Sequence, residues 1–265
     1  MILFPPAKIN LGLNVLFKRQ DGYHEMESCM YQIPFYDILE IIKSDSFKFY
    51  QSGLKVNSKE EENLVVKAFR LMQSNFSIGN VYIHLFKSIP MGAGLGGGSS
   101  NAAYVILGLN DLFNLNLSLN NMRSLSMELG SDCPFFIEKE AKIVTGRGEI
   151  FKNVNIDLEG KFLKIVNPRI HISTKDAYNR LNDFNNYSIE KVINKPIEKW
   201  KKELKNSFEY SAFKNYPEIE LIKNKLYMEG AIYASMSGSG STIYGLYNKQ
   251  PKFSFDKKYE KIFVL

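Results

Sequence analysis

The fold is decided by the stretch Pro90-Met91-Gly92-Ala93-Gly94-Leu95-Gly96-Gly97-Gly98-Ser99-Ser100-Asn101, in which five of seven consecutive residues are glycine. Apolar side chains alternate with others over 81–86, which predicts a strand directly before it. Apolar residues at helical spacing over 102–109 predict a helix that begins near Ser99 or Ser100, either of which can cap it. Glycines adopt positive φ angles, so the N–H groups of such a loop can converge on one anion beside the helix N-terminus. The stretch therefore predicts a phosphate-binding loop.

Several classes of protein place glycines in such a loop. Gly92, Gly94 and Gly97 match the G-x-G-x-x-G pattern, so a dinucleotide-dependent oxidoreductase is an alternative. Against that class, the loop ends in two serines, and Asp111 lies near a predicted helix end, where a ribose-binding acid is not expected. A Walker A loop is excluded because no Gly-Lys-Ser/Thr follows, and the sequence has no His-Arg-Asp or Asp-Phe-Gly of protein kinases. A plain linker would not carry strand and helix patterns tight against both ends.

Length and composition indicate a globular protein with two modest domains. The chain has 265 residues, of which 45% are hydrophobic and 23% charged, so disorder is excluded. The net charge of +6, from 34 basic and 28 acidic residues, suits a small anionic ligand and does not require nucleic acid. A nucleic-acid-binding module is a minor alternative. Motif density falls near residue 150, which predicts a first domain over 1–155 that carries the phosphate-binding loop and a second domain over 156–265.

The cysteines and the apolar segments indicate a cytoplasmic protein. Cys29 and Cys133 are far apart in the sequence and form no C-x-x-C pair, so neither a disulfide framework nor a zinc site is expected. The first residues are too short an apolar run for a signal peptide, and no segment approaches the ~20 apolar residues of a membrane span. We expect no membrane partner.

Polar residues in two segments are candidates for chemistry. The segment 7–17 alternates apolar side chains with a polar series that includes Lys8 and Asn10, which predicts a strand with one polar face. Gly12 in that face indicates a close approach to the backbone. Asp132 lies in a turn of Gly, Ser and Pro before an apolar segment, where a plain turn or cap acid is the alternative to a catalytic one.

Aromatic and small residues mark two further turns. Tyr23 and His24 follow an Asp-Gly turn and could stack on a base and read it, although ordinary loop packing is the alternative. Ser237-Gly238-Ser239-Gly240-Ser241 is a second glycine-serine turn between two strand patterns. The other periodic segments predict helices over 61–74, 119–129, 196–213 and 217–229 and a strand over 162–166. Ser118 can cap the helix over 119–129, and Gly146 and Gly148 predict a hairpin turn between two strands.

Three motifs in this order resemble the kinase superfamily named for galactokinase, homoserine kinase, mevalonate kinase and phosphomevalonate kinase. They are Pro6-Ala7-Lys8-Ile9-Asn10, the loop over 90–100 and Met236-Ser237-Gly238-Ser239-Gly240-Ser241. Within that superfamily, Asp21-Gly22-Tyr23-His24 and Gly130-Ser131-Asp132-Cys133-Pro134-Phe135-Phe136 look like the family of 4-diphosphocytidyl-2-C-methyl-D-erythritol kinases of the non-mevalonate isoprenoid pathway. The resemblance spans most of residues 5–245. It implies an α+β fold, with an N-terminal domain like domain 2 of ribosomal protein S5 and a ferredoxin-like C-terminal domain.

The resemblance implies an ATP-dependent phosphorylation of the 2-hydroxyl of 4-diphosphocytidyl-2-C-methyl-D-erythritol. Another small-molecule kinase of the superfamily is the alternative. The family's catalytic acid falls on Asp132 and its partner lysine on Lys8. A carboxylate can accept the proton of the attacking hydroxyl, and an ammonium beside it keeps that carboxylate ionised. Cys133 departs from the aliphatic residue more usual in the family, which we expect to alter packing and not chemistry.

The same resemblance implies the ligands and the residues that bind them. It implies ATP with Mg²⁺, near which Ser100 would lie, a cytidine-diphosphate-linked polyol as substrate, no nucleic acid and a monomer or weak homodimer. The implied nucleotide-binding residues are Pro90, Met91, Gly92, Ala93, Gly94, Leu95, Gly96, Gly97, Gly98, Ser99, Ser100, Asn63 and Lys87. The implied substrate-binding residues are Asn10, Tyr23, His24, Tyr178, Ser237 and Gly238.

Overall fold

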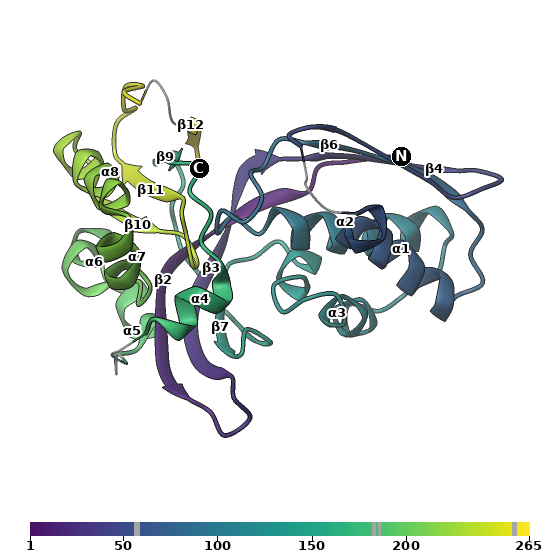
Figure 1. Cartoon of the computed structure of the whole chain (residues 1–265), viewed down its shortest axis with the longest axis horizontal. Coiled ribbons are helices and arrows are strands. Elements are labelled where there is room, and N and C mark those ends of the chain that lie inside the picture. Colours follow the sequence, from purple (N-terminus) through teal and green to yellow (C-terminus); the bar gives the residue numbers. More distant parts are fainter. Residues whose placement is uncertain (56–58, 182–183, 185–186, 256–258) are drawn as a thin grey trace. The chain divides into compact units, whose positions relative to one another are not determined.

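The computed structural model describes residues 1–55, 59–181, 184, 187–255 and 259–265 (Figure 1). The chain divides into two compact units, each built from segments that are discontinuous in sequence. Unit 2 takes segments from both sides of the boundary predicted between residues 155 and 156, and that boundary stays a prediction. Unit 1 consists of Met1–Ala7, Phe35–Met91 and Gly96–Lys139, and unit 2 of Lys8–Pro34, Gly92–Leu95 and Glu140–Leu265.

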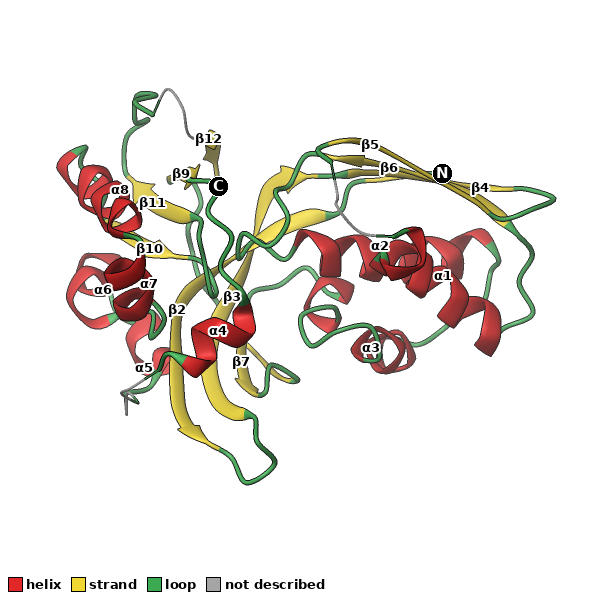
Figure 2. Cartoon of the chain, in the orientation of Figure 1, coloured by secondary structure: helices red, strands yellow, loops and turns green. Residues whose placement is uncertain are grey.

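Unit 1 is a sheet with helices on one face (Figure 2). The strands lie in the order β1-β4-β6-β5, with β5 parallel to β6 and the other pairs antiparallel. The period-2 pattern of β6 buries Ile83 and Leu85 on the face covered by α1 and α2, because alternate side chains of a strand point to opposite faces. The strands are β1 Ile2–Leu3, β4 Ile38–Lys43, β5 Lys48–Gly53 and β6 Val81–Lys87.

The helices of unit 1 begin at caps, one of which differs from the prediction. Asn63 caps α1 by accepting from the Val65 N–H, and Ser118 caps α3 by accepting from the Asn121 N–H, as predicted for Ser118. The prediction that α2 begins near Ser99 or Ser100 is wrong: it begins at Gly97, because Gly96 takes the left-handed conformation in which the chain enters the helix. The helical segments are η1 Glu60–Glu62, α1 Leu64–Asn75, α2 Gly97–Leu112, α3 Leu119–Met127 and η2 Pro134–Ile137.

Unit 2 contains a sheet in the order β2-β3-β7-β8 and another in the order β10-β11-β9-β12. The long strand β2 is buried on both faces over most of its length, so its polar series faces protein and not water. The predicted hairpin turn around Gly146 and Gly148 joins β7 to β8. The strands are β2 Pro6–Lys18, β3 His24–Tyr36, β7 Lys142–Gly146, β8 Ile150–Asn153, β9 Phe162–Asn167, β10 Tyr233–Met236, β11 Ile243–Tyr247 and β12 Tyr259–Val264.

Helices α4, α7 and α8 of unit 2 share a core with the sheet strands β9 to β11, and this core includes Val166, Ile222 and Tyr247. The prediction of one helix over 196–213 is wrong. The chain leaves the helix after Glu203, because Asn206 forms an isolated parallel bridge with Leu13 of β2. The helices are α4 Thr174–Asn179, α5 Ile189–Ile193, α6 Ile197–Glu203, α7 Glu209–Asn215 and α8 Pro217–Met228.

The elements confirm the predicted α+β class, since helices and largely antiparallel sheets occur in both units. None of the helices in the described ranges has the length and apolar character that crossing a bilayer requires.

Candidate functional site

The glycine-rich stretch has the conformation that a phosphate-binding loop needs. Gly92, Gly94 and Gly96 have φ angles of +60°, +79° and +68°, a region that residues with a Cβ atom rarely adopt. Helix α2 follows at once, and the first N–H groups of a helix lack partners within it. The loop therefore brings backbone N–H donors and the positive end of a helix dipole to one segment.

Three motifs that are far apart in the sequence meet in unit 2. The Lys8 N–H donates to the carbonyl oxygen of Leu95 over 2.9 Å, which ties β2 to the glycine-rich loop. The Ser237 hydroxyl donates to the carbonyl oxygen of Gly94 over 2.8 Å, and the Asn10 N–H donates to the same hydroxyl over 3.2 Å. Strand β2, the glycine-rich loop and the glycine-serine turn are thus joined by hydrogen bonds.

Lys8 and Asn10 form the centre of this meeting point. Both are buried, and the Lys8 ammonium donates to Asn10 Oδ1 over 2.5 Å. Asn10 Nδ2 donates to the Ser28 hydroxyl over 2.8 Å, and that hydroxyl donates to the carbonyl oxygen of Gly12 over 2.7 Å. A buried ammonium needs partners of this kind. The network holds the Lys8 side chain in one place and explains the polar face of β2.

The predicted base-reading loop presents stacked rings in unit 2. The His24 and Tyr178 rings stack with centroids 4.8 Å apart, and Tyr178 comes from α4. Burial and the charge of Lys18 lower the pKa of His24, which favours the neutral imidazole with one N–H donor and one acceptor. The more exposed Tyr23 ring lies 4.9 Å from the Arg147 guanidinium. Arg147 was not predicted, although its place in the hairpin turn was.

Asp132 lies in unit 1, in the turn before η2. Its neighbour Cys133 is buried, and burial raises the pKa of that thiol to about 12 against the lowering effect of a hydrogen bond with Ser99. The thiol therefore stays protonated and packs, in agreement with the expectation for this residue. Lys8 belongs to unit 2, so its pairing with Asp132 stays a prediction.

A buried carboxylate that the sequence did not reveal ties together the two flanks of the glycine-rich loop in unit 1. One oxygen of Asp37 accepts from the Ser88 and Ile89 N–H groups over 2.7 and 2.8 Å. The other accepts from Asn101 Nδ2 over 2.9 Å and pairs with the Lys87 ammonium. Burial lowers the pKa of Lys87 while Asp37 opposes that effect. The predicted contact of Lys87 with a nucleotide stays a prediction, since its ammonium pairs with Asp37.

Replacing Asp37 by alanine should destabilise the protein by about 3–5 kcal/mol, because it leaves a buried ammonium without its counterion. Urea unfolding followed by circular dichroism measures this. The double variant Asp37→Ala/Lys87→Met is the control, and it should lose less because no unpaired charge remains. A loss below about 1 kcal/mol in the single variant would show that the pair does not matter for stability.

Asn63 lines a pocket of about 370 Å³ in unit 1. Its Oδ1 caps α1, and its Nδ2 donates to Gln51 Oε1 over 3.2 Å. The carbonyl oxygen of Lys87 accepts from the N–H of Leu54, another lining residue, over 2.8 Å. A volume of this order accommodates a small organic ligand such as a purine base. The full lining is Phe49, Tyr50, Gln51, Ser52, Gly53, Leu54, Lys55, Lys59, Glu60 and Asn63.

The side chain of Ser100 suits contact with a bound group. Its hydroxyl is buried and, within the described part of the chain, has no hydrogen-bond partner. Such an orphaned polar atom is costly, which fits a role toward a bound group. The described residues hold no cluster of three or more His, Cys, Asp or Glu side chains that could bind a metal ion. A Mg²⁺ ion would suit this setting only together with phosphate oxygens, as is usual for that ion.

Comparisons with known proteins agree with this geometry. The GHMP kinases N-terminal domain matches residues 63–140 and the GHMP kinases C-terminal domain residues 188–256. A 4-diphosphocytidyl-2-C-methyl-D-erythritol kinase of Azobacteroides pseudotrichonymphae is 47% identical over 94% of both chains. One of Bacteroides fragilis is 46% identical over 96% of this chain and 94% of its own. A crystal structure of 4-(cytidine 5'-diphospho)-2C-methyl-D-erythritol kinase superposes with a TM-score of 0.81 at 32% identity, covering 93% of this chain and 90% of that one.

Proposed function

The chain belongs to the family of 4-diphosphocytidyl-2-C-methyl-D-erythritol kinases within the GHMP kinases, and from this premise we propose how its residues phosphorylate the 2-hydroxyl of that substrate. Membership confirms the resemblance drawn from the motifs and a kinase activity with ATP as donor. It also sets aside the dinucleotide-dependent oxidoreductase. One observation supports the proposal most. A hydrogen-bond network links residues from the three motifs, namely Lys8, Asn10, Gly94 and Ser237.

Asp132 acts as general base in this proposal. Its carboxylate accepts the proton of the substrate's 2-hydroxyl as that oxygen attacks the γ-phosphorus of ATP, and ADP leaves with the bridging oxygen. The Lys8 ammonium keeps the carboxylate ionised and stabilises the developing alkoxide. Asn10 holds Lys8 through its side-chain oxygen, so Asn10 orients the ammonium as well as contacting the polyol.

The glycine-rich loop and the start of α2 hold the phosphates of ATP. Their N–H groups neutralise the non-bridging oxygens, which is most of what phosphoryl transfer requires from a protein. Mg²⁺, when bound, supplies further charge neutralisation at the phosphates. Ser100 contributes its buried, unpartnered hydroxyl toward that ion. The adenine base occupies the pocket lined by Asn63.

The cytosine end of the substrate is read by the loop of Tyr23 and His24. Tyr23 stacks on the base, His24 hydrogen-bonds its edge, and Tyr178 closes the other face. The neutral imidazole supports this role, because its donor and acceptor can match the amino and ring-nitrogen groups of cytosine. Ser237 and Gly238 contact the substrate beside Asn10. Gly238 lies so close to Asn10 that a Cβ atom added to the glycine would be 3.4 Å from Asn10 Oδ1.

We place the enzyme in the cytoplasm as part of this proposal. Both cysteines are buried and free, which suits a reducing compartment. A monomer or weak homodimer stays a prediction.

A coupled ADP-release assay with Mg²⁺-ATP tests the proposal. The acceptors compared are 4-diphosphocytidyl-2-C-methyl-D-erythritol, mevalonate, homoserine and galactose. We expect turnover with the cytidine compound and a rate at least 10²-fold lower with the others, because they lack the base that Tyr23 and His24 recognise. Equal or faster turnover of mevalonate or homoserine would contradict the assignment.

A further inference from the structure

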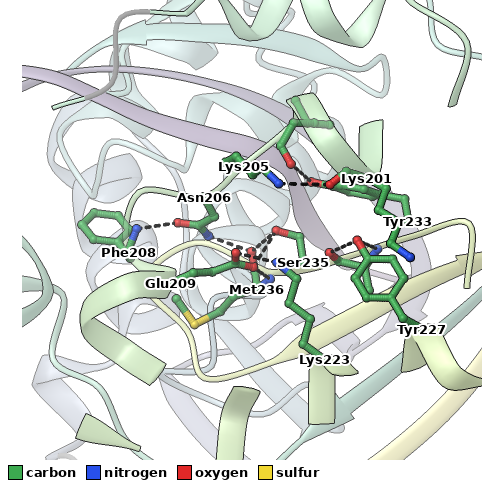
Figure 3. A network of polar contacts seen from close by, with 12 residues as sticks. Lys201, Lys205, Asn206, Phe208, Glu209, Lys223, Tyr227, Tyr233, Ser235 and Met236 are labelled. Carbon is green, nitrogen blue, oxygen red and sulfur yellow. Dashed lines mark hydrogen bonds and ion pairs between the residues drawn. The ribbon is translucent and has the colours of Figure 1, made fainter. Parts of the chain in front are cut away.

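Asn206 and Glu209 hold the strand end from which the glycine-serine turn begins, as Figure 3 shows. Glu209 Oε1 accepts from the Met236 N–H over 2.9 Å, and its Oε2 accepts from the Lys223 ammonium over 2.6 Å. The Met236 carbonyl oxygen accepts from Asn206 Nδ2 over 2.7 Å. The N–H and the carbonyl oxygen of Met236 are therefore both bonded to side chains, one from Glu209 at the start of α7 and one from Asn206 just before it.

The Asn206 amide also reaches past Ser237. Its Nδ2 donates to the carbonyl oxygen of Gly238 over 2.9 Å, in addition to that of Met236. One amide group thus fixes the backbone on both sides of Ser237. The buried Oδ1 of Asn206 accepts from the Phe208 N–H over 2.9 Å, which holds the amide plane in the orientation that both donations need.

The same segment is bonded to β2. The Leu13 N–H donates to the Lys205 carbonyl oxygen over 2.9 Å, and the Ser207 N–H donates to the Leu13 carbonyl oxygen over 2.8 Å. Asn10 lies three residues earlier on this strand, and its N–H meets the Ser237 hydroxyl. Asn206 therefore lies between two elements that carry proposed substrate-binding residues, all within unit 2.

We propose that Asn206 is a positioning residue that sets the substrate affinity of the enzyme by fixing Ser237 and Gly238 against β2. The inference rests on the proposed function, because Ser237 and Gly238 are substrate-binding residues only there. Without Asn206 the two carbonyl oxygens lose their partner, and the turn can leave the conformation that directs the Ser237 hydroxyl to Gly94 and Asn10.

Asn206→Ser tests the proposal with little disturbance of α7. A serine hydroxyl can still accept from the Phe208 N–H, but it is too short to reach the turn. We expect the KM for the cytidine substrate to rise about 30-fold, the equivalent of two ordinary hydrogen bonds, with the KM for ATP within about twofold of wild type. Asn215→Ser is the matched control, since Asn215 also donates to a backbone carbonyl from α7 but is remote from the turn.

A double-mutant cycle with Ser237→Ala asks whether Asn206 acts through Ser237. If it does, Asn206→Ser adds less than about twofold to the KM of a chain that already carries Ser237→Ala. Fully multiplicative effects, or equal rises in both KM values, would overturn the proposal. Asn206→Thr, whose hydroxyl can also accept from the Phe208 N–H and whose methyl group fills more of the space, replaces Asn206→Ser if that variant does not fold.

Hydrogen exchange of the 237–241 turn gives a readout that needs no activity. The turn's N–H groups should exchange at least tenfold faster in Asn206→Ser than in wild type, and at the wild-type rate in Asn215→Ser. Unchanged exchange would overturn the positioning role even if the kinetics changed. Faster exchange in a protein whose wild type does not turn over the cytidine substrate would instead show that the proposed function is wrong.

Discussion

Asp132→Ala is expected to lower kcat by about 10²–10⁴-fold, the range typical of a lost general base, with ATP affinity within about twofold of wild type. The change removes the group that accepts the hydroxyl proton and leaves the glycine-rich loop intact. Rapid-quench measurement of turnover and calorimetric titration with ATP separate the two quantities.

Two further variants serve as controls for the Asp132→Ala result. Asp132→Asn should behave like the alanine variant, because an amide has the shape of the carboxylate and cannot take up the proton. Asp111→Ala, an exposed acid at the end of α2, should retain wild-type turnover. If Asp132→Ala kept a kcat within about threefold of wild type, the general-base assignment would be wrong.

Gly94→Ala is expected to cost about 2–5 kcal/mol of stability and to abolish measurable activity. A Cβ atom there would overlap the carbonyl oxygen of Ser237 and come within 2.8 Å of its carbonyl carbon. The φ angle of +79° adds the strain of a left-handed residue, roughly 1–2 kcal/mol, to overpacking of roughly 1–3 kcal/mol. Because backbone and not a flexible side chain is in the way, the loop and the turn must separate. Urea unfolding and the ADP-release assay measure the two effects.

Gly160→Ala is the matched control. Gly160 has a φ angle of +73°, but within the described ranges a Cβ atom there would meet no heavy atom closer than 4 Å. It should therefore show the conformational strain alone and keep full activity. If both variants lost the same free energy of unfolding, the close contact of Gly94 with Ser237 would not contribute to stability.

Helices and strands could be predicted from the sequence where apolar residues recur at helical or strand spacing within one segment. The strand before the glycine-rich loop and the helix capped by Ser118 follow from local patterns and agree with the structure. The start of α2 was misplaced, because serine is a common cap and nothing local shows that Gly96 turns left-handed. The break at Asn206 was missed for a similar reason: its bridge to Leu13 joins residues 193 positions apart in a 265-residue chain, and no periodicity records that.

Some residues of the candidate site could likewise be predicted from the sequence, and others could not. Lys8, Asp132 and the residues of the loop were named from motifs, because short motifs with fixed spacing are visible in a single sequence. Asp37 was not, since an isolated acid after a strand looks like any turn residue until its four partners are in place. Arg147 could not be predicted, because a contact between its guanidinium and the Tyr23 ring has no signature in the sequence.

The phosphorus NMR spectrum of the reaction mixture tests the central claim most directly. Incubation of the enzyme with Mg²⁺-ATP and 4-diphosphocytidyl-2-C-methyl-D-erythritol should yield one new phosphomonoester resonance in equal amount to the ADP formed, with the diphosphate of the substrate intact. Coupling of the acceptor's carbons to the new phosphorus should place it on the 2-oxygen. ADP accompanied only by inorganic phosphate, or a phosphomonoester on another oxygen, would contradict the proposed reaction.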